Sequence, residues 1–261
     1  MPPANPLRSG LLISFAALVL CGCVRETPSG LQPAKPDLEQ AAHTYTQLGL
    51  TYASEGMLDL AEVKLKKAIE EDSSIAQAHS GLGFVYSQRG NVEAAQAEYS
   101  KAVELDGNDP EIRNNYGVFL CSQKRYQEGD QNFALALKNR NYATPAKGWT
   151  NAGICARQAK DAPRAESDFR QALQLDPNFP GALAEMASLS YEQQNYLRAR
   201  AFLDRYMKVA PPTASVLLLG VNTERALGND DAAHQYELKL VRNFPDSDEA
   251  AKLLKQRSSV P

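Results

Sequence analysis

A pattern of small and large side chains recurs every 34 residues along this chain and constrains its fold more than any other feature. The pair Leu48-Gly49 returns as Leu82-Gly83 and Tyr116-Gly117, and after two inserted residues as Ala152-Gly153. One large side chain per unit follows in the same register: Leu65, Tyr99, Phe133 and Phe169. A repeat of this length is a helix–turn–helix unit that cannot bury its apolar face alone. The pattern therefore predicts a stack of helix pairs in which each unit is stabilised by its neighbours.

The period and the pattern resemble those of the tetratricopeptide repeat (TPR) family. The resemblance implies an all-α fold, a TPR superhelix (α-solenoid) of six helix–turn–helix repeats plus a C-terminal helix. We place the TPR domain at residues 41–258 and its C-terminal helix at 248–257. The six repeats are expected at 42–75, 76–109, 110–143, 146–179, 180–213 and 214–247. Each should contain a helix A, whose glycine admits close approach, and a helix B, whose large residue fills the space between neighbouring repeats.

Turn residues agree with this register, and a few positions depart from it. Glycines are expected where helix A ends and the chain reverses: Gly56, Gly90 and Gly228. The two residues inserted near Thr144-Pro145 predict a local kink in the stack. Gly129 replaces the alanine of helix B in the third repeat, and Tyr236 comes one place early in the sixth. We therefore expect the fifth and sixth repeats to be less regular than the first four.

The first residues have the features of a bacterial lipoprotein signal peptide. Residues 1–22 carry Arg8 and an apolar run too short to span a bilayer. The run ends in a sequence that resembles a lipobox, in which Cys23 would be lipidated; residues 23–40 would then form a flexible tether. Acylated Cys23 would anchor the protein in the membrane, and Val24 in place of aspartate favours the periplasmic face of the outer membrane. The alternative is an ordinary signal peptide, or an uncleaved anchor, with incidental cysteines.

Two further cysteines, Cys121 and Cys155, fall late in helix A of consecutive repeats. Helices A of neighbouring repeats pack side by side, so a disulfide between these cysteines is expected in an oxidising compartment. It would close a loop of about 35 residues and contribute roughly 3 to 4 kcal/mol in the chain-entropy model. The alternatives are two buried free thiols or a catalytic cysteine.

No motif in the sequence points to catalysis. The three histidines His43, His79 and His234 do not combine with other residues into a metal-ligand set. No H-E-x-x-H motif, phosphate loop or nucleophile elbow occurs. We therefore predict that the protein is not an enzyme and has no cofactor, metal or small-molecule substrate. The formal net charge of −3 does not indicate binding to nucleic acid.

In TPR stacks the side chains of helix A line a groove that holds a partner segment. The register places ten candidates there: Thr46, Leu50, Ser80, Phe84, Ser87, Asn114, Asn115, Val118, Thr150 and Asn151. Cys121, Lys147, Ile154 and Arg157 fall along the same helices. Apolar members of this set can anchor a partner, and the asparagine amides can pair with a peptide backbone. A packing role is the alternative for each of them.

Two segments resemble one family of TPR lipoproteins more specifically. They are Asn114-Asn115-Tyr116-Gly117-Val118-Phe119-Leu120-Cys121 and Asn151-Ala152-Gly153-Ile154-Cys155. Together with the lipobox and tether they are similar to the type IV pilus biogenesis/stability lipoproteins, the secretin pilotins of the PilF/PilW family. The resemblance implies that the protein binds the type IV pilus secretin and promotes its localisation and multimerisation in the outer membrane. The alternatives are a lipid-anchored adaptor for outer-membrane protein insertion or peptidoglycan synthesis, and a redox enzyme that uses the two cysteines.

Overall fold

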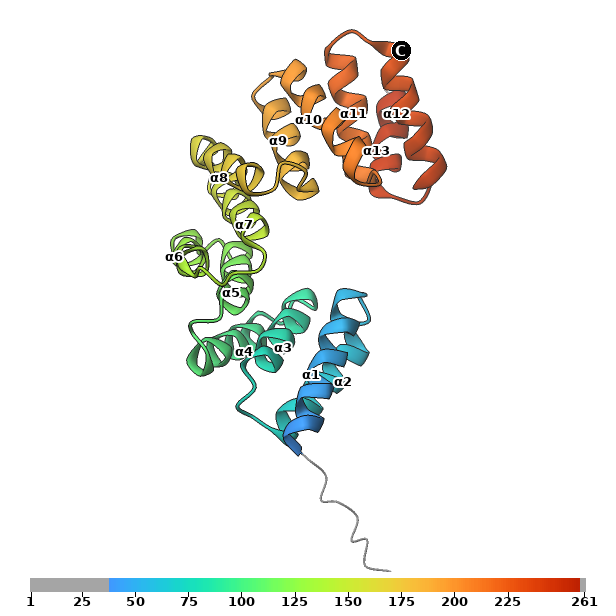
Figure 1. The fold of residues 1–261 in the computed structure, drawn as a ribbon. Helices are drawn as coiled ribbons and strands as arrows, with labels where there is room; N and C mark the ends of the chain where they lie inside the picture. Colours follow the sequence, from blue (N-terminus) through green and yellow to red (C-terminus); the bar gives the residue numbers. More distant parts are fainter. Residues whose placement is uncertain (1–37, 259–261) are drawn as a thin grey trace, which may run out of the picture. The chain divides into compact units, whose positions relative to one another are not determined.

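The computed structural model describes residues 38–258, with side chains up to residue 255, as thirteen α-helices and no strand. Six helix pairs follow one another along the chain, and a single helix comes last (Figure 1). The helices are α1 (Leu38–Ser54), α2 (Leu58–Glu71), α3 (Ala76–Gln88), α4 (Val92–Leu105), α5 (Pro110–Ser122), α6 (Tyr126–Lys138), α7 (Pro145–Gln158), α8 (Ala162–Leu175), α9 (Pro180–Glu192), α10 (Tyr196–Val209), α11 (Ala214–Ala226), α12 (Asp230–Asn243) and α13 (Asp248–Ser258).

The helices contact one another in the order expected of a TPR stack. The first helix of each pair, helix A, packs against the second, helix B, and also against helix A of the next pair. The A helices α1, α3, α5, α7, α9 and α11 are therefore linked by direct contacts from one repeat to the next. The predicted all-α TPR solenoid of six repeats and a C-terminal helix is confirmed.

The observed helix bounds refine the predicted ones. α1 begins at Leu38, inside the segment 23–40 that we predicted as a tether. Residues 38–54 contain no proline that would block a helix, and Glu39 lies in the first turn, where the helix dipole favours an acidic side chain. α7 begins at Pro145, one residue before the expected start of the fourth repeat, because proline is favoured at the first helical position.

One small and one large residue lie at the centre of each helix pair. A Cβ atom built on Gly117 of α5 would lie 2.8 Å from the ring of Phe133 in α6, so glycine is required for this close approach. The same relation, across 16 residues, joins Gly49–Leu65, Gly83–Tyr99, Gly153–Phe169 and Gly220–Tyr236. In the fifth repeat the equivalent pair is Ala187–Leu203, packed in one cluster. We expected the large side chain to fill the space between repeats. In every repeat it also covers the small residue of its own helix A.

The sixth repeat keeps this pair in a shifted register. Tyr236 comes one place early in the sequence, and Gly220, which it covers, is also one place earlier than the glycine of the fourth repeat. Both members of the pair have moved together, so their 16-residue separation is preserved. The sixth repeat is thus displaced by one residue and keeps its packing, contrary to our expectation of a less regular unit.

Two residues after the end of every A helix the backbone is left-handed. Three of these residues are the expected glycines, with φ between 72° and 75°: Gly56, Gly90 and Gly228. The other three are Lys124, Lys160 and Gln194, with φ between 59° and 64°. The sequence did not reveal these three, because a lysine or glutamine gives no sign of this conformation. A side chain makes the left-handed backbone less favourable by roughly 1 to 2 kcal/mol.

The two-residue insertion lies in the loop between α6 and α7. Tyr142 is buried there, and its ring occupies the space beside Gly148, where a Cβ atom would lie 2.6 Å from it. The side-chain amide of Asn139 donates to the backbone oxygen of Asn108 at 2.9 Å and ties the loop to the preceding turn. The loop therefore takes up the insertion, for which we predicted a kink, and α5 and α7 remain in contact.

Helix α13 covers the last repeat. Ala250 and Leu253 are buried, and they pack with Leu217, Val221 and Leu240 of α11 and α12. An uncovered terminal repeat would expose these apolar side chains to water, which is why repeat stacks end in an atypical unit. No described helix has the length and apolar character needed to cross a bilayer.

Candidate partner-binding site

The ten predicted groove residues all lie on A helices, and four of them are buried: Thr46, Ser80, Asn114 and Thr150. The hydroxyl groups of Thr46 and Thr150 donate to backbone oxygens one turn earlier, at 2.9 Å and 2.8 Å. Thr46 and Thr150 are therefore engaged within the stack, whereas the buried Ser80 hydroxyl has no hydrogen-bond partner among the described residues. A partner would meet the six other residues.

A row of apolar side chains runs along the A helices at equivalent positions of the first four repeats. It consists of Leu50, Phe84, Val118 and Ile154, and we call it the apolar row. Phe84 and Val118 are 37% and 44% exposed, and the other two are half-buried. Exposed apolar side chains on contacting helices are a common means of binding another protein.

Three asparagines lie beside this row on α5 and α7. The amide of Asn151 donates to the side-chain oxygen of Asn114 at 3.0 Å, and the amide of Asn114 donates to Asn115 at 3.4 Å. Asn114 is fully buried, whereas Asn115 and Asn151 are half-buried. Asn114 therefore connects the two helices, and its two neighbours can still offer polar atoms to a peptide backbone.

A small depression of about 140 Å³ opens between α5 and α7. Its lining consists of Val118, Cys121, Ser122, Asn151, Ile154, Cys155 and Gln158. Apolar walls with a few polar groups at the edge suit an apolar side chain of an extended segment whose backbone pairs with the amides. At this depression a partner could therefore make both predicted contacts, apolar packing on Val118 and Ile154 and hydrogen bonds to the amide of Asn151.

Cys121 and Cys155 form a disulfide in the structure, with their Cα atoms 5.6 Å apart. The bond joins α5 to α7 across the insertion, and the two cysteines are only 5% and 1% exposed. Reactive cysteines and labile disulfides are usually accessible to solvent. The burial of this pair therefore favours a structural role over redox chemistry.

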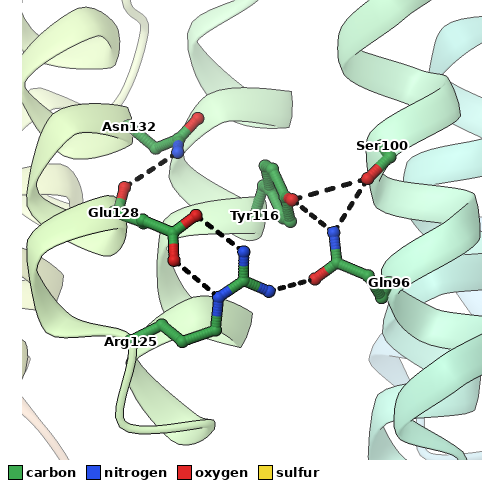
Figure 2. Close-up of polar contacts among 6 residues, drawn as sticks. All are labelled: Gln96, Ser100, Tyr116, Arg125, Glu128 and Asn132. Atoms are coloured by element: carbon green, nitrogen blue, oxygen red, sulfur yellow. Dashed lines mark hydrogen bonds and ion pairs between the residues drawn. The ribbon is translucent and has the colours of Figure 1, made fainter.

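On the B helices the structure contains polar networks that sequence reasoning missed. Figure 2 shows Arg125 between two repeats: it donates to both carboxylate oxygens of Glu128, at 2.7 Å and 2.6 Å, and to Gln96 of α4 at 2.6 Å. The amide of Gln96 donates in turn to Ser100 and to Tyr116 of α5. The hydrogen bonds from Arg125 hold the pKa of the Glu128 carboxyl below its usual value.

Two ion pairs continue this linkage between later B helices. Arg164 of α8 pairs with Asp130 of α6, and Arg198 of α10 pairs with Glu166 of α8 at 2.7 Å. In each pair the acid has the same place in its repeat, and the arginine has the same place in the next one. This spacing of opposite charges is the sequence signal that would have identified them.

Two predictions concern metal binding and lipidation. Within the described residues no three histidine, cysteine, aspartate or glutamate side chains lie together as a metal site requires. Cys23, the predicted lipidation site, lies outside the described residues, as do the predicted signal peptide and most of the tether.

Comparison with known proteins identifies the family of this chain. Residues 52–117 match the tetratricopeptide repeat, and residues 120–242 match the middle TPR-like domain of cilia and flagella-associated protein 70. The chain is 35% identical to the type IV pilus assembly protein PilF of Pseudomonas aeruginosa over 238 residues, which is 90% of this chain and 94% of PilF. This chain belongs to the PilF family.

Solved structures of the PilF family have the same fold. A structure from the functional characterisation of Pseudomonas aeruginosa PilF is 34% identical, with a TM-score of 0.69, and covers 84% of this chain and 99% of its own. The structure of PilW, described as a widely conserved type IV pilus biogenesis factor, is 30% identical, with a TM-score of 0.72, and covers 82% and 99%. The chain is therefore a TPR protein of type IV pilus biogenesis.

The sequence segments that resembled the PilF family lie together in the structure. Residues 114–121 are on α5 and residues 151–155 are on α7, and these two helices contact each other. Together they contribute the asparagines, the depression and the disulfide described above. The two segments that suggested the family in the sequence thus meet at one interface between A helices.

Proposed function

We propose that this PilF-family protein is a pilotin, an outer-membrane lipoprotein that binds the type IV pilus secretin and promotes its localisation and multimerisation. The observation that carries the proposal is the 35% identity to PilF over 90% of the chain. Binding and positioning of a protein partner requires no catalytic residue, and in this proposal the protein is a scaffold and not an enzyme.

The A helices would hold the secretin. The apolar row would take apolar side chains of an extended secretin segment, and the depression beside Val118 would receive one of them. The half-buried amide groups of Asn115 and Asn151 would pair with the backbone of that segment. This division between apolar and polar contacts is the usual one for an extended peptide on a preformed surface.

Acyl chains on Cys23 would supply the membrane address at the periplasmic face of the outer membrane. Two or more acyl chains hold a protein stably at a bilayer, whereas one does so only marginally. The tether would separate the TPR domain from the membrane surface.

The test is the assembly state of the secretin in outer-membrane fractions of a deletion strain. The strain would carry no copy, the native chain or the variant Cys23→Ala. We expect heat-resistant secretin multimers to be lost in the deletion strain and restored in the outer membrane by the native chain alone. Normal multimers in the absence of this protein would refute the proposal.

A second experiment tests the binding surface. Val118→Glu places a charge in the apolar row and should weaken binding of the purified secretin at least tenfold. Val63→Glu is the matched control, because Val63 is 61% exposed on α2, away from the A-helix surface. Equal loss of binding in both variants, or in neither, would exclude the apolar row as the contact surface.

A further inference from the structure

A pair of residues 19 positions apart joins helix A to helix B in the first three repeats. In the second repeat the His79 ring lies 2.6 Å from the Glu98 carboxylate, and this hydrogen bond raises the pKa of His79. In the third, Arg113 donates to Asn132 at 3.0 Å. In the first, the Lys64 ammonium lies over the ring of Tyr45, 5.7 Å from its centre. Each pair thus joins a basic side chain to a group that attracts it: a carboxylate, an amide oxygen or an aromatic ring.

The fourth repeat lacks the cation. Its two residues at these positions are Trp149 on α7 and Asp168 on α8, and no hydrogen bond joins them. In the fifth and sixth repeats both positions are apolar or aromatic: Leu183–Phe202 and Leu217–Tyr236. The fourth repeat therefore retains the acid of the second repeat without a basic side chain at position 149, and its nearest cation is Arg164, one turn earlier on α8.

The Asp168 side chain is buried and incompletely paired. The residue is 6% exposed, and its Oδ2 atom has no hydrogen-bond partner in the described part of the chain. The nearest cation is Arg164, whose Nε lies 3.7 Å from this oxygen and whose Nη1 is engaged by Asp130. The Oδ1 atom of Asp130 is likewise buried without a partner. Two acceptor atoms that would normally be satisfied are thus left on neighbouring side chains.

These two acids line a pocket of about 430 Å³ between α6 and α8. No Cα atom of α6 lies within 8 Å of one of α8, and both helices pack on α7, which carries Trp149. The apolar part of the lining is Phe133, Ala134, Leu137, Trp149 and Ala152. The remaining lining residues are the two acids, Arg164 and Lys138, and the side chain of Lys138 is exposed to water.

We propose that this pocket binds an arginine side chain of a partner protein, with its methylene groups against the Trp149 indole and its guanidinium group at Asp168 and Asp130. A guanidinium group offers five donors, which suits two acceptor oxygens without partners. The methylene stem of an arginine packs on an apolar surface such as the indole while its charged group stays at polar partners. Arg164 pairs with Asp130 and lies within ion-pair distance of Asp168, and the Lys138 side chain is exposed to water. Neither cation donates a hydrogen bond to the two acceptor atoms that lack a partner.

The proposed pocket lies between B helices and is separate from the A-helix surface assigned to the secretin. It would therefore serve a second contact, whose existence does not depend on the pilotin proposal. Failure of the secretin experiments would leave this inference standing, and failure of the arginine experiment would leave the pilotin proposal standing.

Trp149 makes the pocket directly measurable, because the chain contains a single tryptophan. The probe is the peptide acetyl-Leu-Arg-Gly-amide, titrated into the full chain at pH 7.5 while tryptophan emission is recorded. We expect a saturable change in emission. The same peptide with citrulline, which keeps the shape and removes the charge, should bind at least tenfold more weakly. Equal binding of the two peptides would overturn the proposal.

The variant Asp168→Asn should weaken binding of the arginine peptide at least fivefold. Glu104→Gln is the matched control, because it removes one negative charge from an exposed side chain of α4 that pairs with Lys101 at 3.0 Å. Unchanged affinity in Asp168→Asn, or the same loss in both variants, would contradict the proposal.

A measurement on the native chain covers the case in which Asp168→Asn does not fold. Lowering the pH from 7.5 to 5 should weaken binding, because a proton then competes with the peptide for Asp168. The other ionisable groups near this carboxylate are Asp130 and Lys138 on α6, Arg164 on α8 and Asp161 at the N-terminus of α8. Binding that is independent of pH between 5 and 7.5 would overturn the proposal.

Discussion

The sulfur atom of Cys121 occupies the position beside residue 129 where any side chain larger than that of glycine would place its Cβ atom. The backbone oxygen of Gly117 lies 3.1 Å from the same position on the other side. This relationship explains why Gly129 replaces the alanine found in other repeats. The disulfide and the glycine are two parts of one packing arrangement.

The substitution Gly129→Ala should destabilise the oxidised protein by about 2 kcal/mol, the usual cost of forcing an extra group into a packed interior. Urea unfolding followed by circular dichroism would measure it. The control is the same substitution in a Cys121→Ala, Cys155→Ala background, where the sulfur atom is gone and the cost should fall by more than half. Equal costs in both backgrounds would show that the disulfide is not what excludes alanine.

The substitution Lys124→Gly should stabilise the protein by about 1 kcal/mol, because glycine adopts the left-handed backbone of this position without steric cost. The reciprocal control is Gly90→Lys at the equivalent turn of the second repeat, where φ is 74° and a Cβ atom would meet no neighbour. That variant should lose a similar amount of stability in the same unfolding assay. A loss of stability in Lys124→Gly would contradict the prediction.

The substitution Asn114→Ala should cost about 1 to 3 kcal/mol, because it leaves the amide of Asn151 without its acceptor at a buried helix contact. Asn115→Ala is the matched neighbour, since Asn115 is half-buried and accepts only a 3.4 Å hydrogen bond. It should leave the unfolding free energy within about 0.5 kcal/mol of the native value. Secretin binding would respond in the opposite order if Asn115 contacts the partner directly.

The adjacent residues Leu253 and Leu254 offer a test of how α13 is held. Leu253 is fully buried and Leu254 is 55% exposed. Leu253→Ala should lower the unfolding free energy by about 2 kcal/mol through lost burial, whereas Leu254→Ala should change it little. Similar effects of the two substitutions would mean that α13 does not dock through Leu253.

Asp168 should make stability depend on pH in a particular direction. Burial raises the pKa of its carboxyl from 3.8 to about 6, so the folded protein binds this proton more tightly than the unfolded chain does. The contribution of Asp168 to stability is therefore greatest below pH 4, and it decreases as the pH rises through 6, by up to about 3 kcal/mol. Unfolding of the native protein and of Asp168→Asn at pH 4, 5.5 and 7 would isolate this effect. A stability difference between the two proteins that does not change with pH would contradict it.

The sequence predicted the helix pairs correctly because their packing depends on a residue type with a single structural role. Glycine opposite a large side chain identifies the helix pairs, and this is why even the displaced pair Gly220–Tyr236 can be recognised afterwards by its separation. The start of α1 was missed although the sequence carries helix-start signals there: Asp37 is a residue type favoured before the first helical residue, and Glu39 is acidic in the first turn.

The candidate site was less predictable, because a helical position does not determine how deeply a side chain is buried. Register alone placed Asn114 and Asn115 together in the groove, but one is fully buried and the other is half-exposed. The pocket at Trp149 was missed for a different reason. The pocket is recognised because Trp149 stands where the second and third repeats have His79 and Arg113. That difference has a meaning only once the structure shows that these residues pair with the residue 19 positions later.

In a stack whose repeats contact only their neighbours, local opening can begin at either end and spread inward. The covalent link between Cys121 and Cys155 lies near the middle of that path and stays intact when the helices around it open. Amide hydrogens of α5 and α7 should therefore exchange with solvent more slowly than those of the outer repeats. Reduction of the disulfide should remove much of this difference in exchange rate. The bond therefore determines which repeats resist local unfolding most.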